Sequence, residues 1–296
     1  MYLVHCAPLY KKDKSMDHFV QCVQTTRQND GDALFLSHHL GRKAASLTNS
    51  LAVKFCSNHV ELPDSPSVND LLDLSLGLFV LKKLGLEFVR FGYRDFLLQN
   101  VIPQLDAALK SHAWSDIFED EKDAMVWMMV FEYVGLSAFA SRRLYVQRAV
   151  QQARQNHVGP WEKTSRFVTH VVFVLSDWGC KPVQEPCQDE FIYILDNLPR
   201  ALAIDHIELV GEFLHCLRIL NCRLSAAQQA LVQRGKDLLK RHMVANSSQV
   251  SYHTAWCVVV GLGSCEAEVA PLCDVYHAID GSFADAYRPP VDVIFG

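Results

Sequence analysis

The chain lacks a long hydrophobic run, although 50% of its 296 residues are hydrophobic. No segment reaches about 18 uninterrupted apolar residues, the length that a helix needs to span a bilayer. The first ten residues place no basic cluster ahead of an apolar stretch, so they do not have the pattern of a signal peptide. We therefore expect no membrane association and a cytoplasmic location.

The chain also lacks a long run of basic residues. The formal net charge is −5, and the densest basic cluster is the short segment Lys11–Lys14, which Asp13 interrupts. Nucleic-acid binding usually depends on a basic surface, so it is not expected here. A small molecule or a peptide is the expected partner. The acidic surface permits a homodimer without requiring one.

The common catalytic signatures are missing. The chain contains no HExxH, GxSxG, P-loop or GxGxxG motif, which argues against the usual metalloproteases, α/β-hydrolases, nucleotide triphosphatases and Rossmann dehydrogenases. Its ten cysteines form no CxxC pair. Most of them lie in apolar segments and are expected to be reduced, buried thiols, as for Cys22, Cys216, Cys222 and Cys257. A cysteine-rich metal site is therefore not expected.

Helical periodicity of apolar residues is present along most of the chain. Gly, Pro, Ser and Lys residues mark several of the helix ends. The predicted helices cover about 15–29, 33–57, 67–84, 88–111, 120–136, 139–157, 161–178, 187–198, 205–221, 225–243, 251–263 and 266–279. Pro103 and Pro271 fall inside two of these segments and are expected to split or kink them.

These helices predict a single all-α domain over 1–296. It comprises N-terminal helices in 1–60, a main helical body in 61–280 and an extended C-terminal tail in 281–296. Short loops between a dozen helices favour repeated helical hairpins, which form an α/α toroid or partial toroid when they close and a solenoid when they stay open. No strict repeat motif is present, which favours the toroid.

The segment 164–179 carries two ionisable residues in an apolar helix. His170 and Asp177 are seven residues apart, about two helical turns, so we expect them on one face. The residues between them are apolar on all sides, which indicates a buried inner helix. A buried histidine and aspartate need partners. Each could serve a functional site, or could simply cap a helix or bond to a carbonyl.

The segment 203–220 places Glu208, Glu212 and His215 on one face, at positions i, i+4 and i+7. Glu212 could lie at the surface or in a cavity. Glu208 is expected at the surface. His215 could be a histidine of the core.

The segment 251–263 starts with Tyr252 and His253 and continues into an apolar helix that is also expected to be buried. The positive end of a helix dipole disfavours a protonated histidine, which suits a neutral base or a metal ligand. We expect His253 to be functional.

Together these segments supply two imidazoles and two carboxylates, the groups that acid–base catalysis requires. The candidate catalytic residues are His170, Asp177, Glu212 and His253. Three of them, His170, Asp177 and His253, are also candidate ligands for a divalent metal such as zinc. The aromatic residues Trp178, Tyr252 and Trp256 are candidates for substrate binding, with a place in the core as the alternative.

The motif Tyr252-His253-Thr254-x-x-Cys257-x-x-x-Gly261-Leu262 resembles the histidine motif in the β subunits of protein prenyltransferases, which are α/α toroids. In that family the motif's histidine binds catalytic zinc, which implies a zinc ligand at His253. The family's Asp-x-Cys zinc motif has no counterpart in this chain, so the resemblance carries over neither zinc binding nor prenyl transfer.

The region from about Pro63 to Gly263 resembles an uncharacterised family of bacterial helical proteins, many from actinomycetes and some encoded near natural-product genes. The similar segments are Thr169–Gly179, Leu209–Glu212 and Tyr252–Thr254. This resemblance implies that His170, Asp177, Glu212 and His253 belong to one site. The expected function is an enzyme that modifies a peptide or another natural product. The alternative is a non-catalytic helical protein that binds a peptide or a partner subunit in the same groove.

Overall fold

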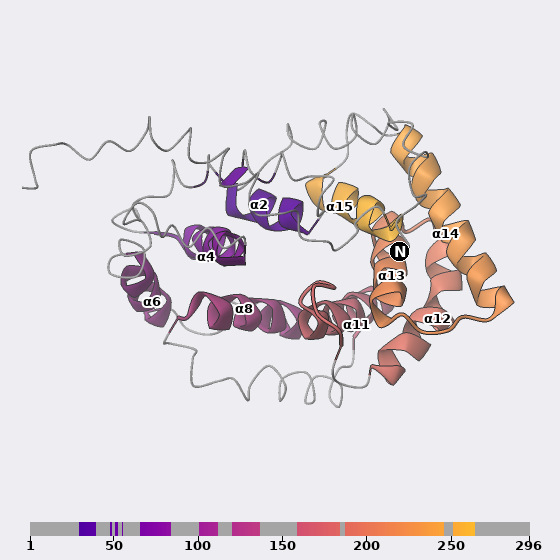
Figure 1. Cartoon of the computed structure of the whole chain (residues 1–296), viewed down its shortest axis with the longest axis horizontal. Coiled ribbons are helices and arrows are strands. Elements are labelled where there is room, and N and C mark those ends of the chain that lie inside the picture. Colours follow the sequence, from indigo (N-terminus) through magenta and orange to yellow (C-terminus); the bar gives the residue numbers. More distant parts are fainter. Residues whose placement is uncertain are drawn as a thin grey trace, which may run out of the picture. The chain divides into compact units, whose positions relative to one another are not determined.

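A computed structural model describes nine helices and the segments next to them (Figure 1). The described residues are 30–39, 48, 51–52, 55, 66–83, 101–111, 120–136, 159–183, 187–245 and 251–263. They divide into two compact units, and the division falls in the first turn of helix α12. Such units can belong to one domain, so the single domain remains a prediction.

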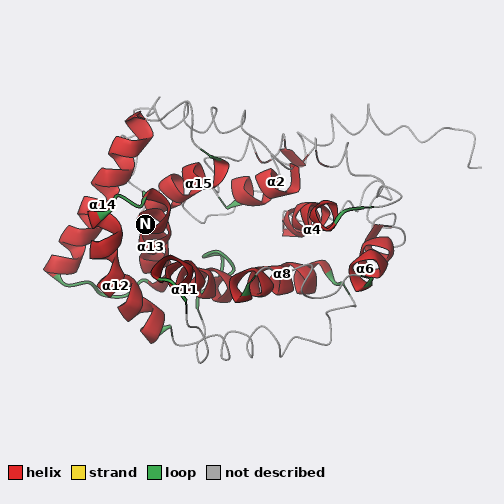
Figure 2. Cartoon of the chain, turned by 180° about the vertical axis from the view of Figure 1, so that it is seen from behind, coloured by secondary structure: helices red, strands yellow, loops and turns green. Residues whose placement is uncertain are grey.

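All regular secondary structure in the described residues is helical (Figure 2), which confirms the all-α class. The closed or partial toroid remains a prediction. No helix within the described ranges is long and apolar enough to cross a membrane. Five of the ten cysteines are described, and all five are reduced thiols. Cys216 and Cys257 are buried as predicted, whereas Cys222 is exposed, so the prediction of a buried thiol is wrong there.

The first unit contains most of α12 and three further helices. Their bounds are Gln188–Ala203 for α12, Ile207–Leu220 for α13, Ala226–Ala245 for α14 and Tyr252–Gly261 for α15. Ser251 is the N-cap of α15, and its hydroxyl accepts a hydrogen bond from the backbone N–H of Thr254 at 3.1 Å. Its residues from Ala255 to Gly261 are buried, which confirms the prediction of a buried helix.

Helices α13 and α15 approach each other very closely at two glycines. A Cβ atom on Gly211 would lie 2.3 Å from the carbonyl oxygen of Cys257. A Cβ on Gly261 would lie 2.7 Å from the Cα of Gly211. Glycine is therefore required here because only its lack of a side chain lets the backbones pass at this distance. The crossing places Glu212, the residue after Gly211, beside Cys257.

The second unit contains five helices. Their bounds are Asp30–His38 for α2, Val68–Lys83 for α4, Ile102–Lys110 for α6, Glu121–Val134 for α8 and Trp161–Ser176 for α11. Helix α4 is buried from Asp73 to Leu81 and packs against α2 and α8. Helices α8 and α11 also pack together.

Three predicted helix ends are wrong, the first because α2 ends at His38, so the predicted 33–57 helix is interrupted there. Helix α12 continues through Pro199 to Ala203, beyond the predicted end at 198. Leu198, Ala201 and Leu202 are buried around this proline, so packing offsets the cost of an interior proline. Helix α11 ends at Ser176, because Asp177 and Trp178 adopt left-handed backbone conformations with φ of 52° and 55°. Asp177 therefore does not share a helix face with His170, contrary to the prediction.

Other predictions are only partly covered. Helix α2 covers the beginning of the predicted 33–57 helix, and Pro103 lies in the first turn of α6. The predicted helices 15–29, 139–157 and 266–279 and the tail 281–296 lie outside the described residues, as does Pro271.

Candidate metal centre

Helix α13 supplies two carboxylates that face α15. Glu208 and Glu212 are four residues apart, so they project from the same side of the helix. The side chain of Glu212 is fully buried, which rules out the surface location that the sequence left open. Glu208 is partly exposed, which agrees with the expected surface position, and its carboxylate also contacts α15.

Helix α15 supplies an imidazole and a thiol. His253 and Cys257 are also four residues apart and meet on the face that is turned to α13. The His253 side chain is 39% exposed. Cys257 is completely buried, and its sulfur lies 3.8 Å from Nδ1 and 3.9 Å from Nε2 of His253.

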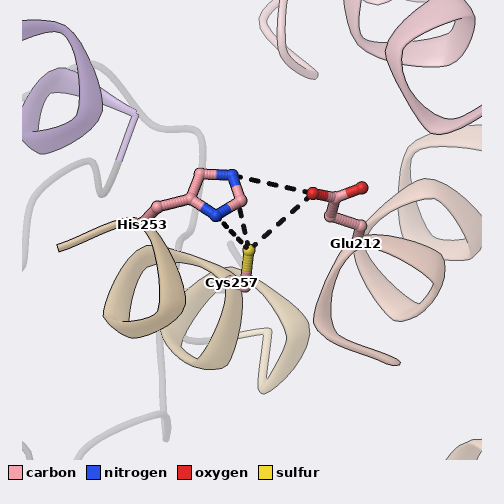
Figure 3. A group of neighbouring side chains, drawn as sticks. All are labelled: Glu212, His253 and Cys257. Carbon is pink, nitrogen blue, oxygen red and sulfur yellow. Dashed lines mark hydrogen bonds and ion pairs between the residues drawn. The ribbon is translucent and has the colours of Figure 1, made fainter. Parts of the chain in front are cut away.

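Three donor atoms converge between the two helices (Figure 3). Nε2 of His253 lies 3.7 Å from Oε1 of Glu212, and Sγ of Cys257 lies 3.9 Å from that oxygen. With the 3.9 Å between Nε2 and Sγ, the three atoms form a nearly equilateral triangle. A point equidistant from them lies about 2.2 Å from each, which matches zinc bonds of about 2.0–2.3 Å.

A second set of groups surrounds the other side of His253. Oε1 of Glu208 lies 3.4 Å from Nδ1 of His253 and accepts a 2.6 Å hydrogen bond from the hydroxyl of Thr254. The Thr254 hydroxyl lies 2.7 Å from that of Ser251, the N-cap of α15. The two ring nitrogens of His253 therefore face different carboxylates.

An aromatic layer lies behind His253. Trp256 is buried, and its ring lies 6.1 Å from that of His253 and 5.9 Å from that of His215. Nδ1 of His215 accepts a 2.6 Å hydrogen bond from Arg218, which also donates to the Val260 carbonyl. Burial, and then the Arg218 charge, lower the pKa of His215. His215 is therefore a neutral residue of the core, one of the alternatives that the sequence left open.

His170 and Asp177 lie in the second unit, with different partners. Nδ1 of His170 lies 2.7 Å from the Arg166 carbonyl, one turn earlier in α11. The carboxylate of Asp177 pairs with the buried ammonium of Lys83 from α4, and Lys181 lies 3.5 Å away. In the described geometry Glu212 lies beside His253. His170 contacts the Arg166 carbonyl, and Asp177 pairs with Lys83. A single site containing all four remains a prediction.

The aromatic candidates differ in position. Trp178 is buried against Phe35, Phe173 and His39, with ring centroids 5.1 to 5.8 Å apart. This packing is that of an aromatic core. Tyr252 begins α15, and its side chain lies outside the described residues.

Sequence reasoning missed Cys257, Glu208 and Thr254 as members of the site. Cys257 was interpreted as a small hydrophobe because its neighbours are aliphatic, and its burial is confirmed. The spacing of four residues from His253 was the signal that could have found it, since such residues share a helix face. The same spacing links Glu208 to Glu212.

Residues 133–245 match the model of a family described as a domain of unknown function (DUF6895). This segment is less than half of the chain and includes Glu208 and Glu212, but it ends before α15. The match is compatible with the expected uncharacterised family. No curated protein and no solved structure matches the chain.

Proposed function

We propose that the first unit holds a divalent metal, most suitably zinc, and that the chain is a metal-dependent enzyme. The single observation that carries the proposal is the triangle of Glu212, His253 and Cys257, whose donor atoms all lie within 4.8 Å of one another. Carboxylate, imidazole and thiolate are the usual zinc ligands. Tetrahedral coordination needs donor separations of about 3.3–3.6 Å, so each distance has to shorten by only a few tenths of an ångström.

Three protein ligands are the number found at catalytic zinc sites, where water or substrate takes the fourth position. Glu212 and Cys257 hold the buried side of the triangle, and His253 forms its exposed side. Solvent therefore approaches from the side of His253. A bound zinc ion would supply an acidified water and a Lewis acid, which suits hydrolysis of an amide or ester. A peptide or another natural product is the substrate class implied by the sequence resemblance.

A non-catalytic metal site is the second candidate. The complete burial of Glu212 and Cys257 favours it, because structural zinc ions are enclosed by their ligands. In that case the ion joins α13 to α15 and stabilises a binding protein.

Activity assays on metal-free and zinc-reloaded protein separate these candidates. An enzyme loses hydrolysis of ester and peptide probes when a chelator removes the metal and regains it with zinc. Glu212→Gln abolishes both binding and activity. Glu190→Gln is the matched control, because Glu190 is also buried but lies outside the triangle. Failure of the wild-type protein to bind zinc would overturn both candidates. Zinc binding that raises stability without any hydrolysis would support the structural one.

A further inference from the structure

The two nitrogens of His253 have distinct environments. Nε2 lies 3.7 Å from Glu212, whereas Nδ1 lies 3.4 Å from Glu208, and the Cys257 sulfur is at nearly the same distance from both nitrogens, 3.9 and 3.8 Å. A neutral imidazole carries its proton on one nitrogen and a lone pair on the other. Only the tautomer with the proton on Nδ1 leaves the Nε2 lone pair available to a metal. A group that stabilises this tautomer would therefore strengthen metal binding at Nε2.

Glu208 is suited to select the Nδ1–H tautomer, because an ionised carboxylate accepts hydrogen bonds and cannot donate one. The carboxylate does not depend on His253 for its position. Thr254 donates to the same Oε1 at 2.6 Å and is itself 2.7 Å from the Ser251 hydroxyl. Ser251 also accepts from the backbone N–H of Thr254, which fixes this chain of groups at the start of α15.

We infer that Glu208 is a positioning residue that holds His253 in the Nδ1–H tautomer and orients Nε2 toward the donor triangle. This inference rests on the proposed metal site. Histidine ligands of zinc commonly donate their second N–H to a carboxylate, and loss of that partner weakens metal binding. The 3.4 Å separation is longer than a well-formed N–H···O hydrogen bond, so the contact in this structure is mainly electrostatic.

The test compares zinc dissociation constants and His253 ¹⁵N shifts for the full chain and three variants. Glu208→Ala is expected to weaken zinc binding by about 10- to 100-fold, the usual effect of losing such a partner. It should also give a mixture of His253 tautomers in the metal-free protein. Glu208→Gln keeps an amide oxygen that can accept from Nδ1–H, so it should retain the tautomer and lose less affinity. Thr254→Val removes the hydroxyl that holds Glu208 and should fall between wild type and Glu208→Ala.

Glu162→Gln is the control, because this exposed carboxylate pairs with Arg166 on its own helix. Equal zinc affinity and an unchanged tautomer in Glu208→Ala would overturn the inference while leaving the metal site in place. If the wild-type chain binds no zinc, the proposed function fails and the inference falls with it. Should Glu208→Ala not fold, Thr254→Val and Glu208→Gln still decide, since a zinc affinity equal to that of the wild type in both variants would contradict the role of Glu208.

Discussion

Gly211 of α13 lies directly against the carbonyl of Cys257 in α15, and a Cβ at Gly211 would lie 2.3 Å from that oxygen. The contact is between backbones, so no flexible side chain can move aside. It brings Glu212 and Cys257 within 3.9 Å of each other. The donor triangle therefore depends on a helix crossing that only glycine permits.

Gly211→Ala is expected to destabilise the chain. Forcing a methyl group into this crossing should cost about 1–3 kcal/mol, more than the gain of up to about 1 kcal/mol that alanine provides in helix propensity. The separation of the helices should also weaken zinc binding. Denaturant unfolding and zinc titration of the same samples measure both effects.

Gly235→Ala in α14 is the matched control. Its Cβ would meet only side-chain atoms of Leu214 and Val210, at 3.1 and 3.3 Å, which can adjust by a few tenths of an ångström. Its stability should change little. Equal losses of stability and zinc affinity in the two variants would contradict the proposed importance of the backbone contact at Gly211.

Breaking the buried pair of Lys83 and Asp177 is expected to destabilise the second unit. Lys83→Met leaves the carboxylate of Asp177, whose side chain is only 11% exposed, with the exposed Lys181 at 3.5 Å as its remaining ion-pair partner. Removing one partner of a buried pair typically costs about 3–5 kcal/mol. Denaturant unfolding measures this loss.

Replacing both partners is the informative comparison. The double variant Lys83→Met with Asp177→Asn should lose less stability than the sum of the single variants, because no buried charge remains. Glu162→Gln, which removes an exposed ion pair, should change the free energy of unfolding by no more than about 1 kcal/mol. Strict additivity of the two buried substitutions would contradict the pairing.

His38 should make the stability depend on pH. Burial, followed by the charge of Lys83, lowers its pKa from 6.5 to about 4, against the opposing effect of Asp177. The ring of His39 also lies close by. Between these two pH values the unfolded chain binds more protons than the folded chain. The free energy of unfolding therefore falls as pH drops from about 6.5 toward 4, by up to about 1.4 kcal/mol per pH unit.

Unfolding curves at pH 7, 6, 5 and 4 measure this dependence. His38→Gln cannot take up the proton, so its stability should vary less over the same range. An identical pH dependence in the variant would assign the effect to other groups.

The helices of the candidate site could be predicted because local patterns determine them. Ser251 caps α15, and the apolar residues that follow are buried, as the sequence indicates. Helix α12 differs because Leu198, Ala201 and Leu202 are buried around Pro199, and tertiary packing of this kind leaves no local signal.

The composition of the site was only partly predictable. Glu212 and His253 were chosen as ionisable residues in apolar helices, and they do meet. Cys257 was omitted because a thiol between aliphatic residues cannot be distinguished from a small hydrophobic core residue in the sequence. Its place beside Glu212 depends on the helix crossing at Gly211, which has no local sequence signal. The helix end at Asp177 could not be predicted because a left-handed conformation at a non-glycine residue has no clear sequence signal.

The most direct test of the metal centre is the zinc content of the purified chain, measured by elemental analysis for wild type, His253→Ala and His170→Ala. The donor triangle predicts one zinc per wild-type chain, loss of zinc in His253→Ala and full retention in His170→Ala, because the described contacts of His170 lie within α11. Absence of metal from the wild type after incubation with zinc, or equal zinc in wild type and His253→Ala, would contradict the account.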